Sequence, residues 1–138
     1  MIFTQELTLL SEGDFYALNI TDRVQSVIDA SGIKEGQALV FYQHTTGAIA
    51  VVEHESGILA DLEEALEKMA PVEGNYHHHQ RGYDQNGAAH VRTALLNVSM
   101  ALPLKEGRLL LGTYQEILMI DFDPGPKLRT VVVQVKGE

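Results

Sequence analysis

Residues 37–53 read QALVFYQHTTGAIAVVE, and the arrangement of the strands depends on this stretch. Its first part, Gln37–Gln43, is apolar on both faces of an extended chain, which is typical of a strand in the interior of a sheet. The next four residues read HTTG and predict a turn, and the following AIAVVE predicts another strand. We therefore expect a central strand that leads into His44 and a second strand that ends at Glu53.

Weaker apolar patterns on both sides supply the remaining predicted elements. Strands and helices do not alternate regularly, so we expect one α+β domain over residues 1–138, β-rich, with a mainly antiparallel sheet or sandwich of about eight strands and two or three helices. The other expected strands are Ile2–Leu9, Phe15–Ile20, Val98–Leu104, Arg108–Asp121 with a bend at Gly112, and Leu128–Val135. The expected helices are 21–32, Ser56–Ala70 and 88–97, and Pro71–Ala89 is expected to be a long loop.

Two of the helices have recognisable ends. Thr21 is the expected N-cap of the first helix, and Gly32 suits the position just past its end. Pro71 stops the second helix. The expected apolar faces consist of Val24, Val27 and Ile28 in the first helix, and of Ile58, Leu62, Leu66 and Met69 in the second.

Composition excludes several classes of function. The net charge is −9, from 19 acidic against 10 basic residues, which argues against binding to nucleic acid or to an anionic membrane surface. The absence of cysteine excludes disulfides, thiolate catalysis and sulfur-based zinc sites. No signal peptide and no membrane-length apolar run is recognisable, so we expect a cytoplasmic protein.

Four of the six histidines lie between Asn75 and Arg92. The run His77–His79 reads most simply as a polar surface loop, since neighbouring residues of an extended chain point in different directions. His90 lies near the start of a short helix, where the helix dipole favours the neutral ring that a metal requires. A lone histidine at a strand end, such as His44, is more often structural than functional. A zinc site of three imidazoles from distant segments is the alternative.

Other polar residues have equally open interpretations. Glu53 is either a solvent-facing strand end or an acid–base group on an apolar face. Asp84 and Asn86 either form a turn or support a ligand, and the segment around Tyr114 reads as a strand break with a packed tyrosine. The arginines available for a phosphate are Arg81, Arg92, Arg108 and Arg129.

Several segments together resemble one family over nearly the whole chain. They read QHTTGAIAVVE, GNYHH, DQNGAAHVRTALL, ALPLKEGRLLLGTYQEI and RTVVVQVKGE, in this order, and GRLLLGTYQ is the most specific of them. The sequence is thereby similar to the YjbQ-like family, whose members are often named secondary thiamine-phosphate synthases. The resemblance implies a compact β-rich α+β domain, a homotrimer and a histidine-lined pocket that can hold a divalent metal, zinc or alternatively magnesium.

The resemblance also implies roles for particular residues. It implies His44, His78 and His90 as the metal ligands, and Arg92 as their basic neighbour. It further implies Glu53, Tyr114 and Gln115 as site residues, with Asp84 and Asn86 in a polar stretch beside them. Many relatives have a further histidine where this chain has Ala88, so a four-histidine site is not expected.

The implied reaction joins a pyrimidine-methyl diphosphate to a thiazole phosphate and releases diphosphate, so the expected partner is a small phosphorylated substrate. Arg92 with a metal would neutralise the leaving group, and Glu53 or Tyr114 would orient the pyrimidine. Two alternatives stay open. One is a metal-dependent hydrolase in which Glu53 takes a proton from bound water, and the other is a non-enzymatic trimeric metal- or ligand-binding protein.

Overall fold

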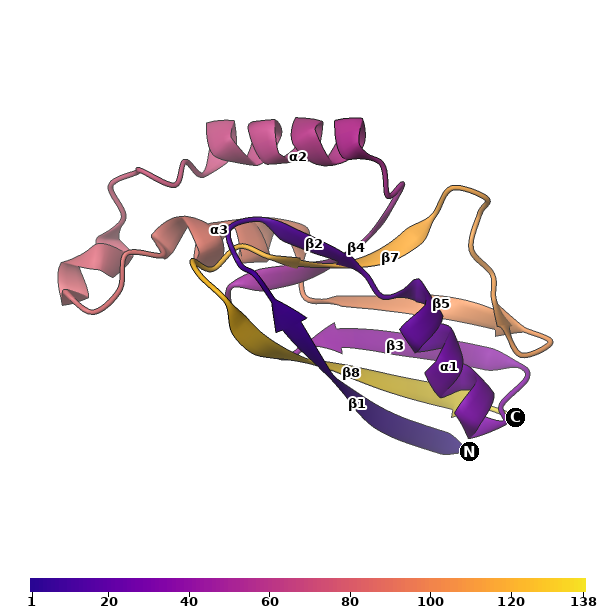
Figure 1. Cartoon of the computed structure of the whole chain (residues 1–138). Helices are drawn as coiled ribbons and strands as arrows, with labels where there is room; N and C mark the ends of the chain where they lie inside the picture. Colours follow the sequence, from indigo (N-terminus) through magenta and orange to yellow (C-terminus); the bar gives the residue numbers. More distant parts are fainter.

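The computed structural model describes all residues from 1 to 138 and contains two antiparallel sheets (Figure 1). Sheet A has the strand order β1-β8-β3-β5-β6, and sheet B has the order β2-β7-β4. The chain therefore has the expected α+β, mainly antiparallel fold. Its strands are β1 (Ile2–Ser11), β2 (Tyr16–Asn19), β3 (Gly36–Tyr42), β4 (Gly47–Val52), β5 (Ser99–Lys105), β6 (Arg108–Leu109), β7 (Glu116–Asp121) and β8 (Lys127–Gly137). Its helices are α1 (Thr21–Ser31), α2 (Ser56–Met69), the 3₁₀ helix η1 (His77–Arg81) and α3 (Gly87–Leu96).

The two strands of residues 37–53 belong to different sheets. Strand β3 lies in the middle of sheet A, between β8 and β5, whereas β4 is an edge strand of sheet B and pairs with β7. The turn that contains His44 is therefore one of the connections between the two sheets. The central position of β3 confirms the prediction, but only one of its faces is buried, because Leu39 and Phe41 on the other face are partly exposed.

The main core lies between sheet A, sheet B and α1, and it consists mainly of branched aliphatic side chains, together with Ala38, Met119 and the ring of Tyr42. Helix α1 contributes Val24, Val27 and Ile28, as its apolar pattern predicts, and ends at Gly32 with a left-handed φ of 71°. The prediction for Thr21 was wrong, because Ile20 occupies the capping position. The Thr21 hydroxyl instead accepts a hydrogen bond from the amide of Ile117 and fixes α1 to the start of β7.

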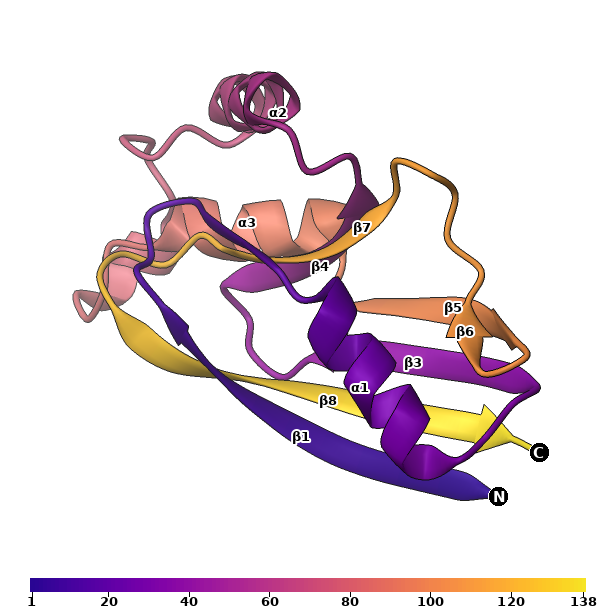
Figure 2. The same ribbon diagram turned by 45° about the vertical axis from the view of Figure 1, so that its right-hand side comes forward.

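Helix α2 covers the side of sheet B that faces away from sheet A (Figures 1 and 2). Leu66 is buried in a second, smaller core with Leu118, Ile120 and Phe122, as the helical pattern predicts. The pattern overstates the buried face, since Ile58 and Met69 at the two ends of α2 remain exposed. The carboxylate of Glu55 caps the helix by accepting from the amides of Gly57 and Ile58. Neither this helix nor any other in the chain has the length and apolar character needed to cross a bilayer.

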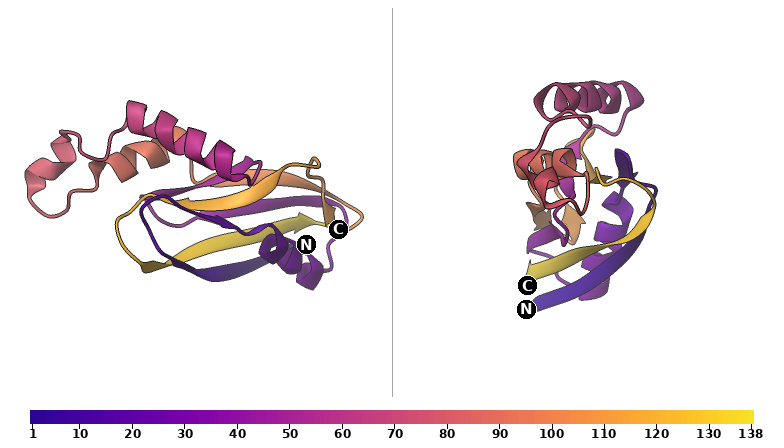
Figure 3. Two further views of the ribbon diagram at one scale, coloured as in Figure 1. Left: turned by 45° about the horizontal axis from the view of Figure 1, so that its top comes forward. Right: turned by 90° about the vertical axis from the view of Figure 1, so that its left-hand side faces the viewer.

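Two long segments differ from the prediction. The loop expected at Pro71–Ala89 contains η1, and α3 already begins at Gly87. The run expected as one bent strand at Arg108–Asp121 divides into β6 and β7, and residues 110–115 connect sheet A to sheet B. Helices α2, α3 and η1 gather at the end of the molecule away from the two chain termini (Figure 3), which lie side by side, with the amino group of Met1 on the carbonyl of Gly137.

Candidate functional site

A cavity of about 530 Å³ lies where the end of β3 faces α3. Strand β3 and the turn after it supply one wall, and α3 with the segment after it supplies the other. Two histidines line this cavity, His44 from the turn and His90 from α3. Its other lining residues are Phe41, Tyr42, Gln43, Thr45, Thr93, Ala94 and Val98. The volume falls within the range of about 300–1,000 Å³ that is usual for small-molecule sites.

The ring of His44 is held in one orientation. Its Nε2 accepts a hydrogen bond of 2.8 Å from the backbone N–H of Thr130 in β8. The ring also packs against that of Tyr42, with centroids 5.1 Å apart and an angle of 62° between the planes. Burial, followed by the nearby guanidinium of Arg129, lowers the pKa of His44 below its ordinary value. His44 is therefore a fixed and neutral ring.

His90 also contacts a second histidine. The ring centroids of His78, in η1, and His90 are 4.5 Å apart. Burial is the largest cause that lowers the pKa of His90, and the neighbouring His78 is the second. No side chain or backbone group of the protein is hydrogen-bonded to the His90 ring, so its nitrogens are available to a ligand.

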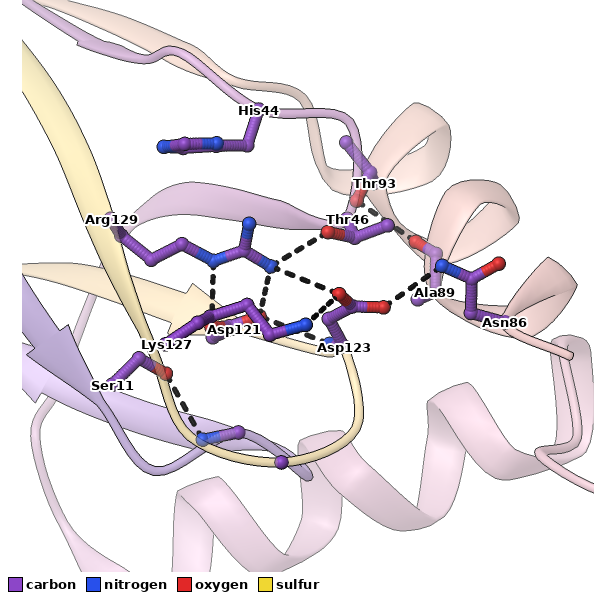
Figure 4. Close-up of polar contacts among 12 residues, drawn as sticks. Ser11, His44, Thr46, Asn86, Ala89, Thr93, Asp121, Asp123, Lys127 and Arg129 are labelled. Carbon is purple, nitrogen blue, oxygen red and sulfur yellow. Dashed lines mark hydrogen bonds and ion pairs between the residues drawn. The ribbon is translucent and has the colours of Figure 1, made fainter. Parts of the chain in front are cut away.

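A chain of hydrogen bonds fixes the orientation of His78 (Figure 4 shows its Asn86–Asp123 part). The amide nitrogen of Asn86 donates to Asp123 Oδ1 at 2.9 Å, so the amide oxygen of Asn86 faces the other way. That oxygen lies 3.2 Å from His78 Nε2, and an oxygen can only accept, so Nε2 carries the hydrogen. The lone pair of a neutral His78 is then on Nδ1. Asp123 is itself paired with Lys127.

The other two histidines of the run have local roles. His79 Nε2 accepts from the backbone N–H of Gly87 at 2.9 Å and thereby satisfies an amide in the first turn of α3. Its ring packs on that of Tyr76, with centroids 5.2 Å apart. His77 is exposed and contacts only Gln80. Of the triple run, His78 is the residue whose ring lies against that of His90.

A buried ion pair under the site was missed from the sequence. Asp121 is fully buried, and both of its oxygens accept hydrogen bonds of 2.8 Å from the guanidinium of Arg129 (Figure 4). The same guanidinium donates to the Thr46 hydroxyl at 2.7 Å, in the turn that carries His44. The only sequence signal was an acid and a base on either side of the DPGP turn. The pair connects the turn of His44 to the segment of Asp123.

Arg92 lies outside this cluster, although the resemblance places it as the basic neighbour of the histidines. Its side chain is buried; Nε donates to the carbonyl of Ala70 at 3.0 Å and Nη2 to Glu67 Oε2 at 2.7 Å. Arg92 therefore holds the end of α2 against α3. Near His78 the arginine is Arg81, which lies 3.6 Å from Asp84 Oδ1, and Asp84 in turn lies 3.9 Å from His78 Nε2.

The remaining predicted site residues lie at the other end of sheet B. In the pairing of β4 with β7, Gly47 is opposite Asp121 at the histidine end, and Val52 is opposite Glu116 at the far end. Glu53 follows Val52 and is exposed, about 20 Å along the chain from Gly47 at the usual rise per residue. Tyr114 is 72% exposed, not packed, and Gln115 accepts from the amide of Gly112 at 2.8 Å. A single chain does not bring these residues to the histidines.

The three predicted metal ligands do not form a preorganised metal site. His90 lies between His44, across the cavity, and His78, but no group of three or more His, Cys, Asp or Glu side chains in the chain is arranged to hold a metal ion. The Nε2 lone pair of His44 is already used by Thr130. Neutral imidazole has only one lone pair of this kind, so His44 does not fit as a ligand here. His78 and His90 alone supply two of the three or four ligands that zinc takes from proteins.

Fold and site together define a class of protein. It is a two-sheet α+β domain with a histidine-lined cavity between the β3–β4 turn and helix α3. The model of the family described as UPF0047 protein YjbQ-like matches residues 5–138. The chain therefore belongs to the YjbQ-like UPF0047 family.

Relatives and solved structures agree with this membership. The chain is 38% identical to a UPF0047 protein of Methanothermobacter thermautotrophicus over 137 residues, which cover 99% of this chain and 94% of the relative. It is 38% identical to one from Archaeoglobus fulgidus, with 94% and 98% covered. A crystal structure of a YbjQ-like protein of unknown function from Sulfolobus solfataricus P2 superposes with a TM-score of 0.93 at 29% identity, over 100% of this chain and 99% of that one. A hypothetical protein from Aeropyrum pernix K1 gives 0.91 at 32% identity, with 98% of each chain covered.

Proposed function

We propose that the protein is an enzyme that transfers an alkyl group, joining a pyrimidine-methyl diphosphate to a thiazole phosphate. The observation that carries the proposal is the cavity between β3 and α3, with the rings of His44 and His90 in its lining. Phe41 and Val98 supply apolar contacts for a planar heterocycle, and the two histidines supply polar atoms that fix its orientation. In the reaction the methylene–oxygen bond breaks, a bond from the methylene to the thiazole nitrogen forms, and diphosphate leaves.

Charge complementarity for the diphosphate is assigned to Arg81. Arg92 and Arg129 are buried and already hydrogen-bonded to carboxylates, so they are not free to move to a phosphate. Arg81 is half exposed, pairs loosely with Asp84, and lies over the exposed ring of Tyr83. Its guanidinium can exchange that contact for a bidentate contact with a phosphate. Arg81→Ala is expected to raise the KM for the diphosphate substrate more than it lowers kcat, because the contact exists before the reaction starts.

We also propose that the site is completed between copies of the chain in a homotrimer. Glu53, Tyr114 and Gln115 lie at the end of β4 and β7 opposite the histidines, so they reach a histidine cavity only if another copy presents them. In this arrangement they orient the pyrimidine. The mass of the untagged protein by light scattering tests the assembly, and a monomeric mass contradicts it.

The hydrolase alternative has less support. It requires Glu53 beside a metal-bound water, and, as for the transferase, only another copy of the chain could bring Glu53 there. It also requires a three-histidine metal centre, which the tautomer of His44 does not fit. No observation in the chain favours the non-enzymatic alternative over the transferase.

The proposal is tested by incubating purified protein with the two phosphorylated substrates and measuring thiamine phosphate by chromatography. His90→Ala is expected to lower the rate by about 100-fold, because loss of an orienting contact that misplaces the substrate by about 1 Å can cost that much. Val91→Ala is the matched control, since Val91 is the exposed neighbour of His90 on α3 and does not line the cavity. The proposal fails if the wild type forms no more product than His90→Ala.

A further inference from the structure

The hydrogen bond between Thr130 and His44 determines which ring nitrogen of His44 carries a hydrogen. A backbone N–H can only donate, and Thr130 donates to His44 Nε2 at 2.8 Å. Nε2 therefore presents its lone pair to Thr130. In the neutral ring, the single hydrogen is then on Nδ1.

This hydrogen bond belongs to the sheet. Strand β3 ends at Tyr42, and just beyond it the amide of Gln43 still donates to the carbonyl of Thr130 at 3.1 Å. The side chain of His44 then accepts from the amide of the same residue, in the place of a backbone carbonyl. The ring of Tyr42 supports the imidazole from one side. Rotation or a change of tautomer would leave the amide of Thr130 without its partner.

The surroundings also keep His44 uncharged. An imidazolium carries a hydrogen on both nitrogens, so it cannot accept from Thr130. The guanidinium of Arg129 lies near the ring, and together with burial it lowers the pKa of His44. The Nδ1 hydrogen has no acceptor within the chain, and the ring lines the cavity. A donor of fixed orientation thus remains available to whatever occupies the cavity.

We propose that His44 is a neutral hydrogen-bond donor, acting through Nδ1, to a planar nitrogen heterocycle in the cavity, and that it is not a metal ligand. The identity of that heterocycle as a pyrimidine rests on the proposed function. A ring nitrogen with its lone pair in the ring plane is a suitable acceptor for an N–H that lies in the plane of the imidazole. The position that the resemblance assigns to a metal ligand is therefore, in this chain, a residue that selects and orients the substrate.

The tautomer is measured by imidazole ¹⁵N–¹H NMR of the full-length wild-type protein. The expected result is an Nδ1–H resonance for His44 with an unprotonated Nε2. Addition of zinc ion alone leaves both His44 nitrogens unshifted, whatever it does at His78 and His90. Addition of the pyrimidine-methyl alcohol shifts the Nδ1–H resonance downfield. An Nε2–H tautomer, a zinc-dependent shift of a His44 nitrogen, or an unshifted Nδ1–H at saturating pyrimidine each overturns the proposal.

Two substitutions of His44 distinguish hydrogen-bond donation to the ligand from packing of the ring. His44→Asn keeps an N–H donor attached to Cγ, whereas His44→Phe keeps the ring and removes the donor. The pyrimidine Kd is expected to rise about tenfold more in the Phe variant than in the Asn variant, as for loss of one hydrogen bond to a ligand. Equal Kd values in the two folded variants, checked by circular dichroism, contradict donation. None of these measurements involves turnover, so a failure to form thiamine phosphate refutes the proposed reaction separately.

Discussion

The two ends of the β4–β7 pair differ in how their polar side chains are held. At the end near Gly47 and Asp121, His44, Asp123 and Arg129 have specific hydrogen-bond partners, and Asp121 is fully buried. At the end near Val52 and Glu116, Glu53 is exposed and Tyr114 points into solvent. His44 and Arg129 of the first group, like Glu53 and Tyr114 of the second, belong to the segments that carry the family resemblance. Only the first is organised by the chain itself.

This difference has a physical cause. Three segments converge at the first end: the β3–β4 turn, the turn after β7 and the start of α3. A polar group there loses its contact with water and therefore needs a hydrogen-bond partner within the protein. The second end lies beside residues 110–115, which belong to no strand. Side chains there keep their water, and only a ligand or another copy of the chain can order them.

The largest expected effect is on stability, and it follows from breaking the buried pair of Asp121 and Arg129 at the end near Gly47. Asp121→Asn leaves the guanidinium of Arg129 charged, buried and without its counterion. We expect the free energy of unfolding to fall by about 3–5 kcal/mol, as for other buried pairs that lose one partner. Urea denaturation followed by circular dichroism measures it.

The control for this variant is Asp84→Asn, since Asp84 is exposed and makes only long contacts, with Arg81 and His78. Its effect should stay below about 1 kcal/mol, the usual range for a surface pair. Equal losses for the two variants would mean that the pair of Asp121 and Arg129 does not stabilise the histidine end.

Removal of Arg92 should affect stability and leave the cavity intact. Arg92→Ala deprives the buried carbonyl of Ala70 of its donor, which should cost about 1–3 kcal/mol in unfolding free energy. Glu67→Gln is milder because Glu67 is half exposed and Gln still accepts a hydrogen bond, so its cost should stay below about 1 kcal/mol. Affinity for the pyrimidine should not change in either variant. If a folded Arg92→Ala protein loses its affinity for the pyrimidine, Arg92 contributes to the binding site after all.

The sequence was a good guide to the elements and a poorer guide to their contacts. Apolar spacing predicted the buried face of α1, and the continuous apolar run at residues 38–42 predicted the central position of β3, because both features are local in the sequence. It did not show that β3 and β4 lie in different sheets, since a turn of a few residues serves a hairpin and a crossing between sheets equally well. It overextended the strand at residues 108–121, because the Leu-rich run at 109–111 is apolar but lies at the exit from sheet A.

The sequence predicted which residues belong to the candidate site better than it predicted what each of them contacts. The resemblance groups His78 with His90, and the structure places their ring centroids 4.5 Å apart, while their role as metal ligands stays a prediction. The roles of Arg92 and His44 depend on partners far away in the chain, namely Glu67 and Thr130. A local sequence pattern does not indicate a partner that lies far away in the chain. The pair of Asp121 and Arg129 was missed for the same reason.

Mixing of variants tests whether the two ends meet in the assembled protein. Glu53→Gln alone should lower the rate of thiamine phosphate formation by about tenfold, as for loss of one orienting hydrogen bond. If Glu53 of one copy serves His90 of another, an equimolar mixture of Glu53→Gln and His90→Ala, unfolded and refolded together, should have about a quarter of its sites intact in a closed ring. Its rate should then exceed the mean of the two separate variants. A rate equal to that mean would place both residues in one subunit's site or exclude Glu53 from the site.

The smallest expected effect is a dependence of stability on pH that arises at the organised end. Because the pKa of His44 is lowered by burial and by Arg129, the unfolded chain binds a proton at this residue more tightly than the folded chain does. The stabilising contribution is therefore complete above the unfolded pKa, about 6.5, and is lost as the pH falls from there through the folded pKa. Urea midpoints at about pH 7.5 and pH 5 should differ less in His44→Asn than in the wild type, because Asn does not titrate in this range. His77→Asn, at an exposed position that contacts only Gln80, should leave the wild-type difference unchanged. A His44→Asn protein with the full wild-type pH dependence would show that the ring of His44 is not held neutral by its surroundings.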